Sequence, residues 1–417
     1  MGYGASVPVP GLKSTDYRRD LALLVGGNTV SAAGNAVYLV AVMLLLKALT
    51  ESALMIGLFQ FLALLPIFLV APVAGALVDR MSRRRVIILS DLYRGVVMIV
   101  AGSLLMLPGF HSRWLVLTTA FLAGIGHALF VPAAQAILPS IVPVAHLHRA
   151  TGLRAASSQI GNLGGNALGG VLFVALGAPM LFIVNGVSFL ASAFQESFIR
   201  AGRARVSTAH TESLVAMAAR GFATVLRDRR LATVLGSQAG LFIVSPVLVI
   251  ALPFLLIDEL GFGEAAVGVY FALALFGGIL SFAALQARDT RAILDLPLVP
   301  VAYLLLAVGF LAVAASPHPL VLAMAAVASG AAAATVYLFT TTWIQLRVEP
   351  ALHGRVFAVM EAANAAVAPV GYLVAGASLE ILGADRRWVL FLVVAGASLV
   401  WSGYLGRSRL RFPAPNV

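Results

Sequence analysis

Long apolar runs separated by short polar breaks dominate this sequence. Each run is about 20 or more residues long, which is the length that a helix needs to cross the hydrocarbon core of a bilayer. Strands of a membrane barrel would alternate apolar and polar residues over about 10 residues, and these runs do not alternate. The pattern therefore predicts an all-α membrane protein.

Composition excludes the soluble alternative. Only 11% of the residues are charged and 61% are hydrophobic, whereas soluble domains carry about 25% charged residues. Such a chain cannot cover a water-facing surface. The first apolar run is too long for the apolar core of a signal peptide and has no small-residue cleavage site, so we interpret it as a retained helix.

We predict twelve transmembrane helices in two sets of six. The first set is 21–46, 53–78, 86–107, 114–138, 148–176 and 178–199. The second set is 231–257, 263–287, 293–315, 318–346, 354–381 and 388–406. The long polar interval at 201–230 is either an amphipathic helix on the membrane surface or a plain linker.

The chain thus divides into an N-terminal six-helix bundle (1–200), a central cytoplasmic loop (201–230) and a C-terminal six-helix bundle (231–417). Two short loops in corresponding positions, VPVAHLHR (142–149) and EPALHGR (349–355), each contain a Pro, a His and an Arg. The similarity is either chance or the trace of a six-helix repeat, a known transporter construction.

Basic residues set the orientation. Numbering the loops from an inside N-terminus puts 24 of the 28 Lys and Arg on the cytoplasmic side. Positively charged loops stay in the cytoplasm, so we predict that both termini are cytoplasmic in a bacterial inner membrane. The net charge of +11 then orients the protein in the lipid bilayer, and we expect no nucleic-acid partner. We expect a monomer.

A dense basic segment, GALVDRMSRRR (75–85), follows the second apolar run. Gly75 would let a neighbouring helix approach closely, and Asp79 could pair with Arg83. Arg83, Arg84 and Arg85 would hold the turn at an anionic lipid surface. On the residues alone, the segment either serves only as a membrane anchor or has a further role in the protein's function.

This segment resembles the loop 2–3 signature of the major facilitator superfamily, glycine-x-x-x-aspartate-arginine-x-glycine-arginine-arginine, with Ser82 in place of the second glycine. The segments 85–95, 129–143 and 354–371 are similar to a drug-efflux branch that includes macrolide and enterobactin exporters. The resemblance implies two pseudo-symmetric bundles and a cytoplasmic latch that closes the outward-open state. The residues it assigns to the latch are Gly75, Asp79, Arg80, Arg83 and Arg84, with Gly354 and Arg355 as partners.

Helix five departs from the proton-antiport pattern of that superfamily, glycine-x-x-x-glycine-proline-x-x-glycine-glycine. Here the motif contains Gly161, Gly165, Gly169 and Gly170, but Asn166 occupies the proline position. The glycines would still permit tight packing, whereas the bend that proline causes is not expected. The fourth helix also has no arginine in TTAFLAGIGH. Proton antiport is therefore a hypothesis.

Ionisable residues inside membrane helices are costly and often functional. Asp91 and Arg94 lie on one face of the third helix and form either an interfacial ion pair or part of a substrate site. His127 is either a packed histidine or a proton carrier. Glu361 is either a gate partner or a group that titrates during transport. These four are the candidates for proton coupling.

A central cavity between the two bundles would be mostly apolar. Its candidate lining residues are polar or aromatic and lie midway along their helices: Asn28, Asn35, Tyr38, Gln60, Gln135, Gln159, Asn162, Gln238, Tyr337, Trp343 and Asn364. So few charges suit a lipophilic or amphipathic substrate better than a sugar or phosphate.

The leading hypothesis is a secondary transporter that exports lipophilic small molecules by alternating access. A lipid or lysophospholipid translocator is the alternative, and a membrane-embedded enzyme is less favoured because no catalytic motif is evident. A channel is disfavoured because rings of like charge are missing. We predict no cofactor and no metal site, with the proton gradient as the energy source.

Overall fold

The computed structural model describes residues 14–110, 112–143, 146–200, 228–286, 297–316, 318–348 and 353–407. Every regular element in these ranges is a helix, which confirms the all-α prediction. Eleven helices have the length and composition to cross a membrane. The central loop predicted at 201–230 lies outside the described residues, apart from its last three.

The N-terminal half contains α1 (Ser14–Thr50), α2 (Ala53–Arg80), α3 (Arg83–Leu105), α4 (Arg113–Ile141) and α5 (Leu147–Glu196). The ends of α2, α3 and α4 lie close to those of the predicted spans 53–78, 86–107 and 114–138. The ends of α1 extend further, because a helix can continue from the hydrocarbon into the interface without losing its backbone hydrogen bonds.

One long helix, α5, combines two predicted spans. It runs for 50 residues, and Gly177 inside it has φ 74° and ψ 160°. Glycine adopts positive φ at little cost, whereas a side chain would be strained there. Pro179, two residues later, cannot donate a backbone hydrogen bond. The break thus falls at the single residue that separates the predicted spans 148–176 and 178–199.

The C-terminal half contains α7 (Arg229–Phe254), α8 (Ala265–Gln286), α10 (Leu298–Ala315), α11 (Pro319–Arg347), α12 (His353–Leu382) and α13 (Arg387–Arg407). A π-helical turn, η2 (Leu255–Glu259), continues α7, and a 3-10 turn, η4 (Ala384–Arg386), precedes α13. The π turn was not predicted, because nothing in the apolar pattern distinguishes it from an ordinary helix end.

Polar side chains cap several helix starts. Ser82 accepts a hydrogen bond from the Arg85 backbone N–H at the start of α3, so the residue that replaces a signature glycine acts as an N-cap. Asp228 accepts from the backbone N–H groups of Arg230 and Leu231 at the start of α7. Such caps satisfy backbone donors that have no partner within the helix.

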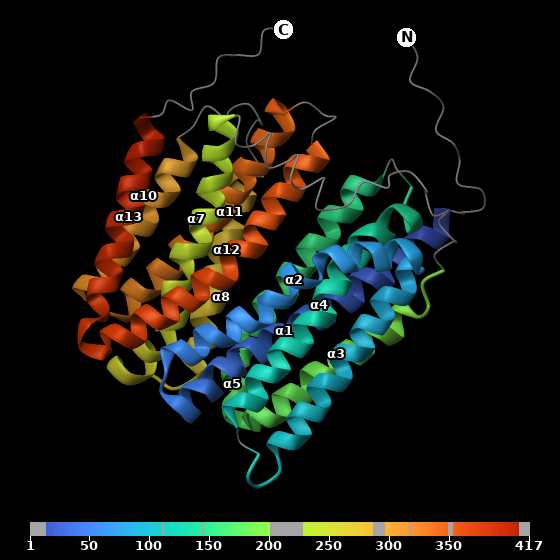
Figure 1. Cartoon of the computed structure of the whole chain (residues 1–417), viewed down its shortest axis with the longest axis horizontal. Coiled ribbons are helices and arrows are strands. Elements are labelled where there is room, and N and C mark those ends of the chain that lie inside the picture. Colours follow the sequence, from blue (N-terminus) through green and yellow to red (C-terminus); the bar gives the residue numbers. More distant parts are fainter. Residues whose placement is uncertain are drawn as a thin grey trace.

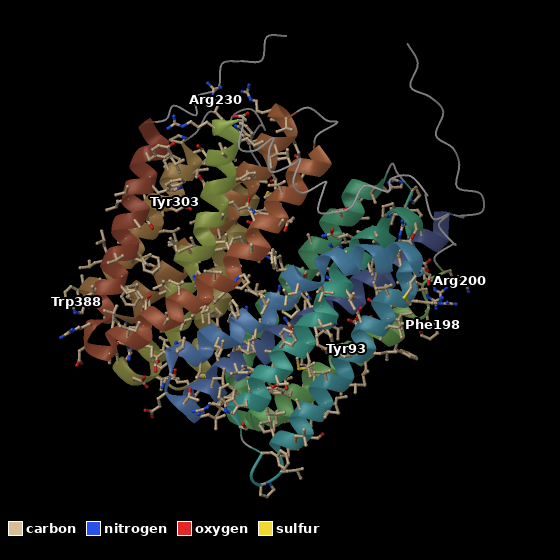
Figure 2. The ribbon with its side chains drawn as sticks, viewed as in Figure 1. Tyr93, Phe198, Arg200, Arg230, Tyr303 and Trp388 are labelled. Atoms are coloured by element: carbon tan, nitrogen blue, oxygen red, sulfur yellow. The ribbon has the colours of Figure 1, made fainter. Side chains whose placement is uncertain are left out.

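The helices gather into two bundles that lie at an angle to each other and meet at one end (Figure 1). We call the end where α1 begins and α13 ends the terminal end, and the end where α1 ends and α2 begins the distal end. Arg200 and Arg230 both lie toward the terminal end (Figure 2). The bundles diverge in that direction.

Apolar packing follows the same division. One large buried cluster contains residues of both halves, among them Val42, Phe59 and Phe254. A second cluster, with Leu24, Phe130 and Ile137, belongs to the N-terminal half alone. The halves therefore share a core near the distal end, while the N-terminal half has a core of its own toward the terminal end.

Candidate functional site

The two halves touch through glycines where α2 crosses α12. A Cβ atom added to Gly57 would lie 2.5 Å from the Tyr372 carbonyl oxygen, and one added to Gly376 would lie 2.7 Å from the Ala53 carbonyl oxygen. Real Cβ atoms do not approach backbone atoms this closely, so any side chain would push the helices apart. Gln60 on α2 also interacts with the Tyr372 hydroxyl.

A second crossing joins α5 to α8. A Cβ atom on Gly170 would lie 2.6 Å from the Glu264 carbonyl oxygen, and one on Gly268 would lie 2.3 Å from the Asn166 carbonyl oxygen. The backbones of the two halves are therefore in direct contact here. Small residues allow such close approach between membrane helices.

The helix-five glycine motif thus faces two directions. Gly161, Gly165 and Gly169 lie against α1, since added Cβ atoms would meet Thr29, Ala33 and Val40. Gly170 instead faces α8 across the boundary between the halves. The α5 backbone stays helical through Asn166 and leaves helical angles at Gly177.

Charged residues surround the distal end of this boundary. Lys47 on α1 forms an ion pair of 2.5 Å with Asp258 of η2, which joins the two halves. The Leu54 backbone N–H donates to Glu380 on α12 at 3.4 Å.

On the C-terminal side, Arg387 pairs with Glu259 at 2.9 Å. Lys47 Nζ and the Arg387 guanidinium each lie 5.3 Å from the centre of the Phe254 ring. A cavity of about 350 Å³ opens at this end, and Lys47, Phe254, Asp258, Glu380 and Arg387 are among the residues that line it.

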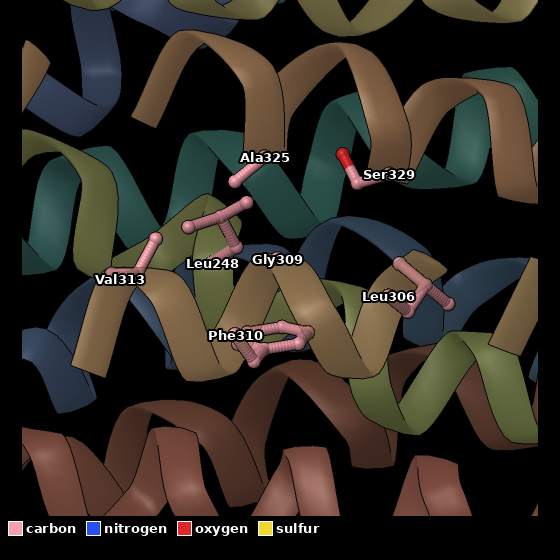
Figure 3. A pocket seen from close by; sticks show the side chains of 7 residues that line it. All are labelled: Leu248, Leu306, Gly309, Phe310, Val313, Ala325 and Ser329. Carbon is pink, nitrogen blue, oxygen red and sulfur yellow. The ribbon is translucent and has the colours of Figure 1, made fainter. Parts of the chain in front are cut away.

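A second, much smaller cavity lies inside the C-terminal half (Figure 3). Its walls come from α7, α10 and α11, and Leu248, Phe310 and Ser329 are among them. Its volume is about 10 Å³, room for about one water molecule. This cavity is part of the bundle packing and cannot hold a substrate.

The predicted latch falls mostly outside the described side chains. Those of residues 71–80 and 353–355, which include Gly75, Asp79, Arg80, Gly354 and Arg355, are not described. Arg83 donates to the Ala136 carbonyl oxygen of α4 at 3.0 Å, and Arg84 donates to the Ser197 carbonyl oxygen after α5. Both arginines thus bind backbone within the N-terminal half, and the latch stays a prediction.

Several residues predicted to line the cavity are buried in this structure. Tyr38 is 3% exposed and lies edge-on to the rings of Phe59 and Phe182. Trp343, Gln238 and Asn364 are also buried. The sequence could not show this, because each of these positions is set by neighbours from other helices.

The remaining cavity candidates are accessible or make polar contacts. Asn28 is buried and donates to the Arg154 carbonyl oxygen and the Ser157 hydroxyl of α5, both at 3.4 Å. Tyr337 is 49% exposed. Gln135 and Gln159 are exposed, whereas Asn35, Gln60 and Asn162 are half-buried.

Glu361 and His127 are both exposed in this structure. Glu361 lies on α12 close enough to Tyr337 of α11 for their charges to interact. His127 lies on α4 within electrostatic range of Arg94. Neither is a packed core residue, and their roles in proton coupling stay predictions.

Asp91 and Arg94 form the predicted ion pair, but not at the membrane interface. Asp91 is 0% and Arg94 6% exposed, because α4 and α5 cover this face of α3. A third ionisable residue joins them: Glu196, the last residue of α5, is 0% exposed. Glu196 was not among the predicted site residues, since it stands near the polar end of the predicted span 178–199.

Solved structures share this fold. The nucleoside transporter NupG, as its D323A mutant, aligns with 93% of this chain and 99% of its own at a TM-score of 0.74 and 12% identity. A bacterial homologue of the human lysosomal transporter Spinster aligns with 97% of this chain and 100% of its own at a TM-score of 0.75 and 15% identity.

The model of the family described as transmembrane secretion effector matches residues 19–415, and the chain belongs to this family. This match and the relatives below show a multi-pass transporter of the major facilitator superfamily, and not an enzyme. The superfamily is the one that the loop 2–3 segment led us to expect.

Characterised relatives are efflux proteins. Macrolide efflux protein A of Streptococcus pyogenes is 27% identical over 164 residues, 39% of this chain and 40% of the relative, so the match spans about two-fifths of that protein. The multidrug efflux pump Tap of Mycolicibacterium fortuitum is 26% identical over 385 residues, 88% of this chain and 90% of the pump.

Proposed function

We propose that the protein exports lipophilic or amphipathic small molecules across the bacterial inner membrane by alternating access. The observation that carries the proposal is the asymmetry of the boundary between the halves. Backbone contacts and an ion pair join the halves at the distal end, whereas the bundles diverge toward the terminal end (Figure 1). Rocking of two such halves would expose a central site to each side in turn.

Orientation follows from the basic residues. The positive-inside rule puts the terminal end in the cytoplasm, so this structure corresponds to an inward-facing state. The Spinster homologue of similar fold was solved in an inward-facing conformation, which is consistent with this assignment. We infer twelve membrane crossings, since α5 crosses once on each side of Gly177.

The substrate class rests on the relatives and on the scarcity of charge. One relative is a macrolide efflux protein and another a multidrug efflux pump. The candidate lining residues contribute hydroxyl, amide and ring groups, and none of them is an acid. Such a surface favours amphipathic molecules over strongly hydrated ones.

Everted membrane vesicles test the proposal. Vesicles that contain the protein should accumulate a radiolabelled macrolide when a proton gradient is imposed, and collapse of the gradient should release it. Vesicles without the protein are the control. Accumulation of a labelled lysophospholipid in place of the macrolide would favour the lipid translocator, and accumulation of neither would refute export of this substrate class.

A further inference from the structure

Two fully buried carboxyl groups lie within electrostatic range of one guanidinium group, that of Arg94, in the N-terminal half. Asp91 of α3 and Glu196 of α5 are each 0% exposed. Arg94 donates a hydrogen bond to Asp91 Oδ1. The Arg94 guanidinium lies 4.2 Å from the centre of the Phe189 ring and 4.5 Å from that of Phe130. These aromatic faces hold the cation in place.

The carboxyl groups lack the donors that two carboxylates would need. Asp91 Oδ2 and both side-chain oxygens of Glu196 have no hydrogen bond in the described structure. Ser192, one turn before Glu196, lies near both carboxyl groups, but one hydroxyl supplies only one donor. A buried carboxylate without donors or a partner charge is very costly.

Among the described residues, Arg94 is the cation that acts on the two carboxyl groups, and the other charged groups nearby are directed elsewhere or would not help. Arg84 of α3 donates to the backbone carbonyl oxygens of Glu196 and Ser197. Asp20 of α1 accepts from the Arg200 backbone N–H at 3.0 Å and would add negative charge. On α4, a positive His127 would repel the Arg94 guanidinium. The local charge with two carboxylates is therefore −1, and one proton brings it to zero.

We propose that Asp91 and Glu196 bind one proton between them, and that this proton is released and regained during transport. A protonated carboxyl donates a hydrogen bond, so the same proton supplies a missing donor and balances the charge. A metal cation would instead be repelled by Arg94, which already occupies the space between α3, α4 and α5. The release step, unlike proton binding, rests on the proposed transport function.

The site adjoins the helix that carries the first cavity candidates. A Cβ atom added to Gly27 of α1 would lie 2.9 Å from the Ser192 hydroxyl oxygen. The next residue, Asn28, donates a hydrogen bond to the Ser157 hydroxyl of α5. A change in the charge of the site would thus act on α1 at Gly27, next to Asn28, which is a predicted cavity residue. Proton and substrate must prefer different states for such coupling to drive export.

Infrared difference spectroscopy of the purified protein in lipid nanodiscs tests proton binding. Wild-type protein should show the band of a protonated buried carboxyl that disappears in alkaline buffer. Glu196→Gln should lose this band, and so should Asp91→Asn, because the one remaining acid is then balanced by Arg94. Asp385→Asn, which removes an exposed acid, is the control and should keep it.

Three results would overturn the inference: no such band in the wild type, a band at full strength in both Glu196→Gln and Asp91→Asn, or a band that responds to sodium against choline chloride at constant pH. The last would identify a metal-cation site. Size-exclusion profiles and melting temperatures show whether each variant is folded. If one variant is not folded, the other single variant and the sodium comparison still test whether the two carboxyl groups bind a proton.

Transport separates the role of the proton from the proposed function. Glu196→Gln should lose gradient-driven macrolide accumulation in everted vesicles while exchange down a substrate gradient survives. Wild-type vesicles that accumulate nothing would refute the proposed export but leave the infrared result standing. Wild-type vesicles that accumulate macrolide, with Glu196→Gln vesicles that do so equally at every pH, would refute the coupling alone.

Discussion

The distal and terminal ends of the boundary between the halves are built differently. At the distal end, glycines of α2, α5, α8 and α12 let backbone meet backbone, and one apolar cluster includes residues from both halves. Toward the terminal end, the N-terminal half has a separate apolar cluster, and Arg83 and Arg84 bind carbonyl oxygens of their own half.

Under the proposed alternating access, this difference would let the two halves close firmly at one end and still open at the other. Contacts between glycine surfaces bring no long side chains into register, so they can form and separate as rigid surfaces. The separate core keeps the N-terminal half intact while the ends of the helices move apart. Under that proposal, the distal end is the closed end in this structure, and the terminal end is the part expected to close in the opposite state.

Gly170→Val should have the largest effect on this closure. The new side chain would overlap the Glu264 carbonyl oxygen and Ala265 of α8, and overpacking costs about 1–3 kcal/mol. That cost falls on the state with a closed distal end, so distal closure and transport should both decline. Gly164→Val on the same helix is the matched control, because Gly164 has open space around it. Equal transport by both variants would show that the crossing is not needed.

Asp79→Asn tests the terminal end. If the predicted latch closes that end in the outward-open state, loss of the carboxylate should increase the inward-facing population and slow transport. An ion pair at a wet interface contributes only about 0–1 kcal/mol to stability, so the melting temperature should change little. Full transport with an unchanged conformational balance would remove the latch from the account.

Lys47→Met should have the smallest effect. It removes the ion pair with Asp258, which is partly exposed and so contributes at most about 1 kcal/mol, or about fivefold in the balance between states. Arg387→Met removes an ion pair within one half and should leave the balance unchanged. A larger shift with Arg387→Met than with Lys47→Met would contradict the assignment of Lys47 to the closure.

The sequence predicted the helices well because membrane spans are local features. The predicted boundary between residues 176 and 178 matches the break at Gly177, where glycine and a nearby proline interrupt the apolar run. The superfamily was likewise predictable, because residues 75–85 resemble its loop 2–3 signature.

Side-chain environments were less predictable, since they depend on which helices meet. Tyr38 was expected to line a cavity but packs against Phe182 of α5. Asp91 and Arg94 were expected at the interface, yet α4 and α5 bury them. Glu196 was overlooked because its burial depends on α3, a helix about 100 residues earlier in the chain.

Distance measurements between spin labels test the central claim, that the halves rock about a common boundary. The chain has no cysteine, so a pair of cysteines can be introduced and labelled without background. The pair Arg200 and Arg230 reports on the terminal end, and the pair Leu107 and Asp385 reports on the distal end. Gly170→Val should lengthen the distal distance and shorten the terminal distance, while Gly164→Val should reproduce the wild-type values. A distal distance that lengthens while the terminal distance stays the same would contradict alternating access by rocking of the two halves.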